Sequence, residues 1–325
     1  MTRKITSAGQ PFAASHAKTS RKRLQNKSTL NSGYGIFLIP GIVMFTIIII
    51  LPFLMNIGVS FTKWQGIGTP VWIGLTNYQK LMRDTTFWAS FKNNLILIIA
   101  ITIIPTIIGL LLSTVLFGYV ADRFGKPVSN FFRGGFYLPQ ILPVAIAGVI
   151  WGWLLQPDGT FNWFLRSIGL GFLAHNWLGD AATALPTVMV IMIWFQIGYP
   201  LVIFMSALQR IDPELLEAAA LDGASGLQGF FYITLQIIRP EIFVVILTTT
   251  IYALKIFGQI FVLTRGGPGT ATMVPSYFAY QNFFEKSNVG YGAAISTIMT
   301  LIILVVTVLF INFQTRQGRS LGENL

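Results

Sequence analysis

The sequence predicts an all-α membrane protein with six transmembrane helices. Hydrophobic residues make up 54% of the chain and charged residues only 10%, whereas a soluble domain carries about 25% charged residues. The mean hydropathy is +0.67. A helix needs about 20 apolar residues to cross a bilayer, and six segments meet this requirement. They cover residues 35–59, 95–118, 135–155, 184–208, 242–263 and 292–312.

Charged residues are almost absent from these segments. Five of the six contain no Asp, Glu, Lys or Arg, and the segment 242–263 contains only Lys255. Prolines, in contrast, are frequent. A proline kinks a helix, and membrane proteins tolerate it where neighbours or a water-lined cavity satisfy the freed carbonyls. The prolines favour a transport pathway over a passive anchor, although ordinary bundle packing also fits them. They are Pro40, Pro52, Pro105, Pro139, Pro143, Pro186 and Pro200.

The distribution of Lys and Arg predicts that both termini lie in the cytoplasm, because cytoplasmic flanks are rich in these residues. Fourteen of the 22 basic residues fall in 1–34, 119–134, 209–241 and the tail 313–325. Seven fall in the remaining loops. The net charge of +11 therefore follows the membrane topology and does not indicate nucleic-acid binding.

The first 34 residues form a basic arm without hydrophobic periodicity. We expect a disordered cytoplasmic arm close to anionic membrane lipid.

Several function classes lack the residues that they need. The six segments contain no Asp or Glu, so the intramembrane carboxylates of an ion-coupled secondary carrier are missing. His16 and His175 are isolated and cysteine is absent, which argues against a metal site. No stretch matches the phosphate-binding pattern G-x-x-x-x-G-K-[ST]. We therefore expect no enzyme, and no metal or nucleotide bound by this chain.

The loop 209–241 is acidic where a cytoplasmic loop should be basic. Asp212 suits a helix N-cap, Pro213 the first helical position and Glu214 the positive end of the helix dipole. Gly223 suits the end of that helix, and a second short helix is expected from about Gly226. The carboxylates argue against a hairpin lying on anionic lipid. The loop instead favours docking to a soluble protein.

The stretch IDPELLEAAALDGA, residues 211–224, resembles the Glu-Ala-Ala loop of permease subunits of binding-protein-dependent ABC importers. Further matches point to the carbohydrate-uptake branch of maltose-, lactose- and glycerol-phosphate-type permeases. They are WIGLTNYQKL (72–81), WFQIGYPLVIFMSALQ (194–209), LTRGGPGTAT (263–272) and YFAYQNFFEKSNVGYGAAIS (277–296). The resemblance covers almost everything after the basic arm.

One departure lies near the end of the loop, where the family usually has Leu-Pro and this chain has Leu235-Gln236. We expect the second loop helix to continue further here.

The resemblance implies an ABC-importer permease fold in a prokaryotic plasma (inner) membrane. The chain would form half of a heterodimer with a second permease subunit. An extracytoplasmic solute-binding protein would deliver a carbohydrate, and two ATPase subunits on the cytoplasmic face would bind ATP and Mg. The loop would be the coupling-helix loop. Its expected coupling residues are Asp212, Glu214, Glu217, Ala218, Ala219, Asp222 and Gly223.

The substrate pathway is expected on the fourth and fifth segments. A sugar site uses aromatic faces together with amides or hydroxyls, and a charged residue in a span can line a pathway. Each candidate also fits helix packing or an interfacial aromatic belt. A non-sugar solute such as glycerol phosphate or a polyol derivative is the alternative substrate. The candidates are Trp194, Gln196, Tyr199, Tyr252, Lys255 and Gln259.

Overall fold

The computed structural model describes the backbone of residues 36–322 and the side chains up to residue 314. The basic arm expected over 1–34 lies outside the described residues. The chain divides into two compact units, 1–56 and 57–325. In the first unit residues 36–56 are helical; they belong to a 25-residue apolar helix, Ile36–Ser60, that includes η1 (Thr46–Ile50) and α2 (Leu51–Ser60).

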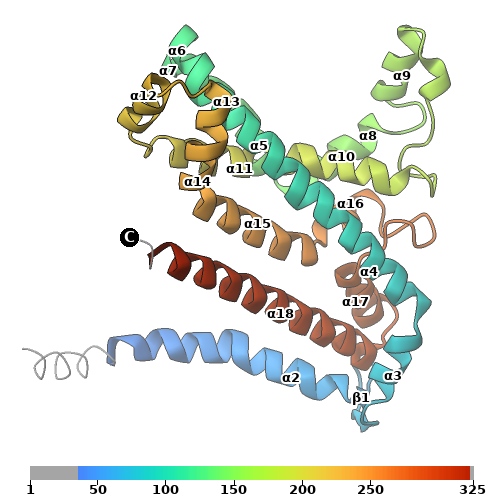
Figure 1. Ribbon diagram of the computed structural model, residues 1–325. Helices are drawn as coiled ribbons and strands as arrows, with labels where there is room; N and C mark the ends of the chain where they lie inside the picture. Colours follow the sequence, from blue (N-terminus) through green and yellow to red (C-terminus); the bar gives the residue numbers. More distant parts are fainter. Residues whose placement is uncertain (1–35, 323–325) are drawn as a thin grey trace, which may run out of the picture. The chain divides into compact units, whose positions relative to one another are not determined.

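The second unit is helical apart from one short hairpin (Figure 1). Strands β1 (Thr62–Lys63) and β2 (Val71–Trp72) pair antiparallel, with Thr62 opposite Trp72. The α3 helix (Thr76–Arg83) follows. A 40-residue helix, Thr85–Phe124, comes next. It consists of α4 (Thr85–Ile98), η2 (Ile99–Ile103), α5 (Ile104–Val115), η3 (Leu116–Val120) and α6 (Ala121–Phe124).

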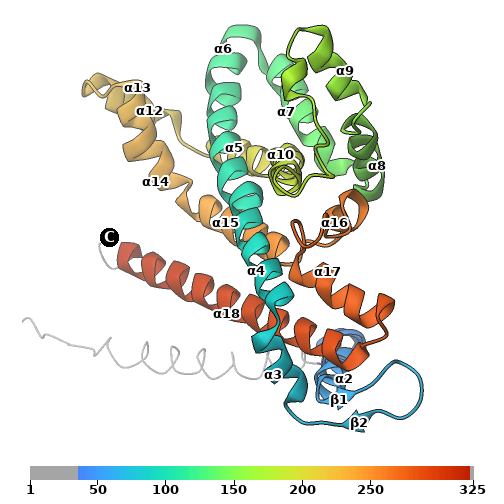
Figure 2. The same ribbon diagram turned by 90° about the vertical axis from the view of Figure 1, so that its right-hand side faces the viewer.

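The remaining helices include two long rods and several shorter pieces (Figure 2). Residues 184–208 form one rod, made of α10 (Ala184–Gln196) and α11 (Gly198–Leu208). The last rod is α18 (Val289–Gly322). The shorter elements are α7 (Lys126–Ile141), α8 (Val144–Leu154), α9 (Thr160–Ser167), η4 (Gly171–Leu173), α12 (Pro213–Leu221), α13 (Gly226–Gly229), η5 (Phe230–Thr234), α14 (Leu235–Ile237), α15 (Arg239–Leu254), α16 (Gly258–Leu263), α17 (Pro275–Tyr280) and η6 (Gln281–Glu285).

Within the described residues, four helices are long and apolar enough to cross a membrane, and up to six if each of two bent pairs counts as one span. The first pair is α7 with α8, bent by 94°. Its bend follows from Pro143, because a residue before proline avoids the helical conformation, and Leu142 is extended with ψ 132°. The second pair is the helix 226–237 with α15, bent by 66°.

The structure therefore differs in detail from the expected segments. The expected span 135–155 consists of two helices that separate at Leu142 and Pro143. The expected span 242–263 starts within α15 and is interrupted between Leu254 and Gly258. The helix expected over 95–118 is longer at both ends and runs from Thr85 to Phe124.

The core lies where α4, α10, α16, α17 and α18 meet. Fully buried side chains from five elements contact one another there, namely Leu97, Met192, Ile260, Tyr277 and Ile295. A second close contact joins α5 to α11. A Cβ atom placed on Gly109 would lie 2.7 Å from the Cβ of Pro200 and 2.9 Å from the nitrogen of Leu201. Glycine lets these two backbones approach closely, as small residues do in membrane helices.

Candidate functional site

The loop 209–241 folds into a helical hairpin, α12–α14 (Pro213–Ile237). The N-cap predicted at Asp212 is confirmed: its carboxylate accepts from the backbone N–H of Glu214 at 3.1 Å. Gly223 ends α12 with φ +83°, a conformation that favours glycine. The second helix begins at Gly226 with a capping box between Ser225 and Gln228.

The second helix continues through Leu235 and Gln236 to Ile237, as the absence of the usual Leu-Pro predicts.

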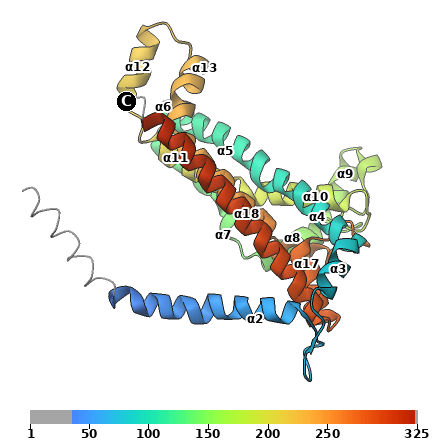
Figure 3. The same cartoon turned by 60° about the horizontal axis from the view of Figure 1, so that its bottom comes forward.

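The hairpin leaves α12 without a buried residue. Figure 3 shows α12 and α13 projecting from the end of the bundle where α6 and the end of α18 lie. Leu221 is 89% exposed and Leu227 73% exposed. All the expected coupling residues are exposed except Ala219, which is half-buried. A helix that exposes leucines and carboxylates in this way presents a large uncovered surface to a partner.

The base of the hairpin, by contrast, is firmly packed. Ile211 and Ile238 lie at its two ends and are both buried in one cluster with Ala207 and Leu208, against which Leu110 packs. Outside this cluster the Arg210 guanidinium pairs with the Glu241 carboxylate. The ends of α11 and α15 are therefore joined by apolar packing and by an ion pair at the point where the hairpin begins and ends.

Several polar side chains lie along α15 and on the neighbouring helices α11 and α16. The Tyr199 hydroxyl of α11 lies 3.0 Å from the Thr248 hydroxyl, and the Gln259 amide donates to the Tyr252 hydroxyl at 2.6 Å. Thr248, Tyr252 and Lys255 follow one another at spacings of four and three, which places them on one helix face. We call Tyr199, Thr248, Tyr252, Lys255 and Gln259 the polar row. Sequence reasoning missed Thr248, which its position four residues before Tyr252 would have indicated.

The α15 part of the polar row ends at the interruption between α15 and α16, and Gln259 lies on the α16 side. Lys255 caps α15 and is exposed. Ending a helix inside a membrane frees carbonyl groups that need donors. The Asn94 amide donates to the Ala253 carbonyl at 2.9 Å, and the Ser276 hydroxyl donates to the Ile256 carbonyl. Side chains of α4 and α17 thus stabilise the interruption.

Two of the six pathway candidates lie outside the polar row. Trp194 packs edge-on against Trp151 of α8 and against Phe195, with ring centroids 5.4 Å and 5.5 Å away. Gln196 is buried, with 4% of its surface exposed. The structure brings Tyr199, Tyr252, Lys255 and Gln259 into the row and places these two residues within helix packing.

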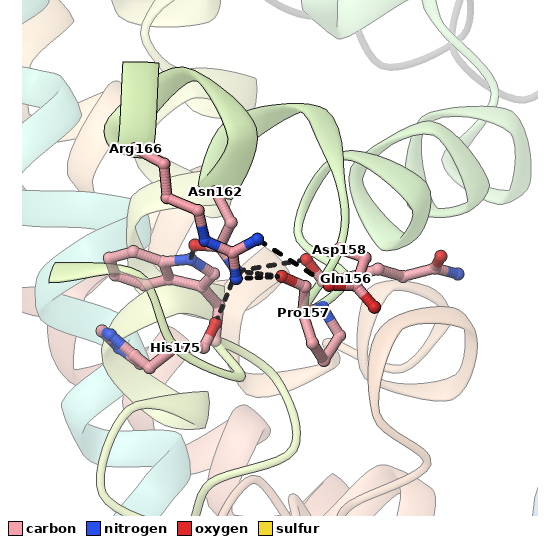
Figure 4. A network of polar contacts seen from close by, with 7 residues as sticks. Gln156, Pro157, Asp158, Asn162, Arg166 and His175 are labelled. Atoms are coloured by element: carbon pink, nitrogen blue, oxygen red, sulfur yellow. Dashed lines mark hydrogen bonds and ion pairs between the residues drawn. The ribbon is translucent and has the colours of Figure 1, made fainter. Parts of the chain in front are cut away.

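Another polar network organises the loop between α8 and α10 (Figure 4). The buried Asn162 amide nitrogen donates to the carbonyls of Gln156, Pro157 and His175 at 3.2, 3.0 and 2.8 Å. Its amide oxygen accepts from the Trp177 indole at 2.7 Å. Each backbone carbonyl is thereby satisfied, so this network has a structural role. His175 supplies a carbonyl to it and is not part of any metal-ligand cluster among the residues that the structure describes.

The membrane-length helices and the helix interrupted beside the polar row define a multi-pass membrane protein. Residues 114–322 match the family described as "Binding-protein-dependent transport system inner membrane component". A probable ABC transporter permease protein of Pyrococcus horikoshii is 36% identical over 276 residues, which cover 83% of this chain and 91% of that protein. A probable starch degradation products transport system permease protein of Thermoanaerobacterium thermosulfurigenes is 32% identical and covers 85% and 91%.

The fold matches solved structures as well. A bacterial ABC transporter involved in the import of the acidic polysaccharide alginate aligns with a TM-score of 0.74 and 23% identity, covering 90% of this chain and 99% of that one. The chain therefore belongs to the family of binding-protein-dependent transport system inner membrane components. The resemblance expected from the Glu-Ala-Ala loop is confirmed.

Proposed function

We propose that this chain is the transmembrane permease subunit of an ATP-driven importer for a sugar or oligosaccharide. Its six spans would be the helix 36–60, the helix 85–124, α7 with α8, α10 with α11, α15 with α16, and α18. Both termini would lie in the cytoplasm of a prokaryotic cell with the hairpin α12–α14. The names of its relatives support the substrate class, since they include permeases for starch degradation products and for trehalose and maltose.

The observation that carries this proposal is the exposed hairpin on a packed base. A soluble partner that binds α12 and shifts it would move the ends of α11 and α15 as one unit, because Ile211 and Ile238 share one buried cluster. Those two helices also carry the polar row. Movement of the hairpin would therefore change access to the row, which is the geometric requirement of alternating access.

The assembly would contain a second permease subunit, two ATPase subunits and an extracytoplasmic solute-binding protein. ATP and Mg would be bound by the ATPases, and this chain would have no catalytic role. A secondary carrier is the weaker alternative, because α10, α11, α15 and α16 contain only one carboxylate, Glu241, and Arg210 pairs with it at the membrane end of the hairpin.

The test is co-purification of the partner ATPase subunits with this chain from its native membrane. Glu217→Lys and Gly223→Asp should both abolish ATPase co-purification and uptake while membrane insertion stays normal. Asp158→Lys is the matched control, because it reverses the charge of a side chain that is 96% exposed but lies in the loop between α8 and α10. Wild-type ATPase recovery in both hairpin variants would contradict the proposal.

The alternative substrate class, an anionic solute such as glycerol phosphate, is favoured by one observation. Lys255 is an exposed cation at the end of the polar row. Lys255→Gln should leave uptake of a neutral sugar within about twofold and reduce uptake of an anionic solute by about tenfold or more, the effect of losing a charge-assisted contact of roughly 1.5–3 kcal/mol. Competition of labelled substrate by neutral and phosphorylated sugars separates the two classes.

A further inference from the structure

A groove of about 520 Å³ lies between α5 and α15. One wall is formed by Ile103, Thr106, Ile107 and Leu110, and the other by Arg239, Ile242, Phe243 and Ile246, with Leu235 and Gln236 of α14 at one end. Apart from Thr106, Gln236 and Arg239, the residues that line the groove are apolar. Its cationic residue, Arg239, is the first residue of α15.

The groove faces away from the polar row. Thr248 lies two residues beyond Ile246, and two residues turn an α-helix by about 200°. The polar row and the groove therefore occupy nearly opposite faces of α15. A ligand in the groove contacts the side of α15 opposite the polar row and not the proposed pathway.

Two polar side chains of the groove, Arg239 and Thr106, lack a polar partner within the part of the chain that the structure describes. Among the described residues, no carboxylate lies within ion-pair distance of Arg239, whose guanidinium instead sits 5.7 Å from the ring centroid of the groove residue Phe243. The Thr106 hydroxyl is buried, with 7% of the residue exposed, and makes no hydrogen bond. Leaving a buried hydroxyl unpaired is costly. The Thr106 oxygen is closed off from the groove in this side-chain rotamer, and rotation about χ1 would turn it toward a ligand.

The positions of these groups match one ligand class. Leu110 and Ile242 pack against the same buried cluster at the end of the groove near Arg239. Thr106 lies four residues before Leu110, which is about 6 Å further along the axis of α5. An anionic phospholipid places a phosphate at the membrane surface, ester carbonyls below it and an acyl chain below those.

We propose that the groove is a binding site for an anionic phospholipid. Arg239 binds the headgroup phosphate, and the Thr106 hydroxyl donates to an ester carbonyl. The acyl chain lies along Ile103, Ile107 and Ile246. Arg239 directly follows Ile238 at the base of the hairpin. Binding of an anionic headgroup to Arg239 therefore affects the position of the first turn of α15.

The first test uses the full chain in phosphatidylcholine vesicles with spin-labelled phosphatidylglycerol or spin-labelled phosphatidylcholine. We expect about fivefold preference for phosphatidylglycerol, the contribution of one basic residue at the surface. Arg239→Gln should abolish this preference. Arg210→Gln is the matched control, since it removes the same charge outside the groove, and it should keep the preference. Retained preference in Arg239→Gln, or equal loss in both variants, overturns the site.

Thr106→Val provides a second measurement, because it removes the hydroxyl and keeps the side-chain shape. It should weaken binding of both lipids by the same factor, since both carry ester carbonyls. An effect on neither lipid contradicts the assigned role of Thr106.

A cross-linking test distinguishes lipid from protein in the groove. The chain has no cysteine, and Ile107 is 54% exposed, so Ile107→Cys accepts a single benzophenone label in native membranes that contain the whole assembly. A photoproduct with one phospholipid supports the proposal. A photoproduct with another polypeptide overturns it.

Discussion

The side-chain amide of Asn94 in α4 donates a hydrogen bond of 2.9 Å to the backbone carbonyl of Ala253, at the end of α15. The two residues are 159 positions apart in the sequence, and Asn94 is completely buried. The bond adds a second donor to a carbonyl at the interruption of the helix, which also accepts from the backbone N–H of Ile256 at 3.2 Å. The interruption beside Lys255 thus depends on a donor from a distant helix.

Asn94→Leu should destabilise the protein because it removes the side-chain donor to the Ala253 carbonyl, which then keeps the backbone N–H of Ile256 at 3.2 Å. We expect a loss of about 0.5–1.5 kcal/mol in the free energy of unfolding, the net contribution of one hydrogen bond, measured by thermal unfolding in detergent. Asn130→Leu serves as a control, because Asn130 is exposed; it should have little effect. Equal melting temperatures for wild type and Asn94→Leu would contradict this account of the interruption.

The contact between α5 and α11 leads to a second prediction. Gly109→Ala places a methyl group 2.7 Å from Pro200, so one helix must shift, and overpacking of this kind costs about 1–3 kcal/mol. In the same long helix, a methyl group added to Gly118 would meet no other atom within 4 Å, and Gly118→Ala should be neutral or stabilising because alanine favours helices. Thermal unfolding of the two variants compares them directly, and equal destabilisation would argue against close packing at Gly109.

The two hydrogen bonds of the polar row should differ in strength. Tyr252→Phe removes the acceptor of the buried Gln259 amide, which should cost about 1–3 kcal/mol. Tyr199→Phe should cost less, because the Thr248 hydroxyl also donates to the Val244 carbonyl at 2.8 Å. If the row lines the pathway, both variants also raise the KM for uptake severalfold. An unchanged KM in both would remove the row from the pathway, whatever the change in stability.

The ion pair between Arg210 and Glu241 provides the last prediction. The Arg210 side chain is 67% exposed, but that of Glu241 is only 23% exposed. Glu241→Gln should leave unfolding almost unchanged, because it frees an exposed cation, whereas Arg210→Gln leaves a largely buried carboxylate unpaired and should cost about 1–3 kcal/mol. Because the pair joins the two ends of the hairpin, Arg210→Gln and Glu241→Gln should also lower uptake per ATP hydrolysed severalfold. The exchange Arg210→Glu with Glu241→Arg should restore coupling. Failure of the exchange, with normal single variants, would show that the pair has no part in coupling.

The sequence alone was sufficient for the features that depend on local composition. Long apolar segments predict membrane helices because the hydrocarbon core requires them, and the residues Asp212, Pro213 and Gly223 predict the limits of α12 because capping depends on neighbouring backbone groups. The break at Pro143 carries a local signal of the same kind, since proline restricts the residue before it, but the expected segment 135–155 runs through it.

Only the tertiary structure decided where distant residues meet. No local signal at Lys255 predicts that the helix stops there, because the stop depends on donors from Asn94 and Ser276 in other helices. The pairing of Tyr199 with Thr248, the exclusion of Trp194 from the polar row and the groove between α5 and α15 have the same origin. Each depends on which faces of separate helices pack together. The spacing of residues along one helix does not determine this packing.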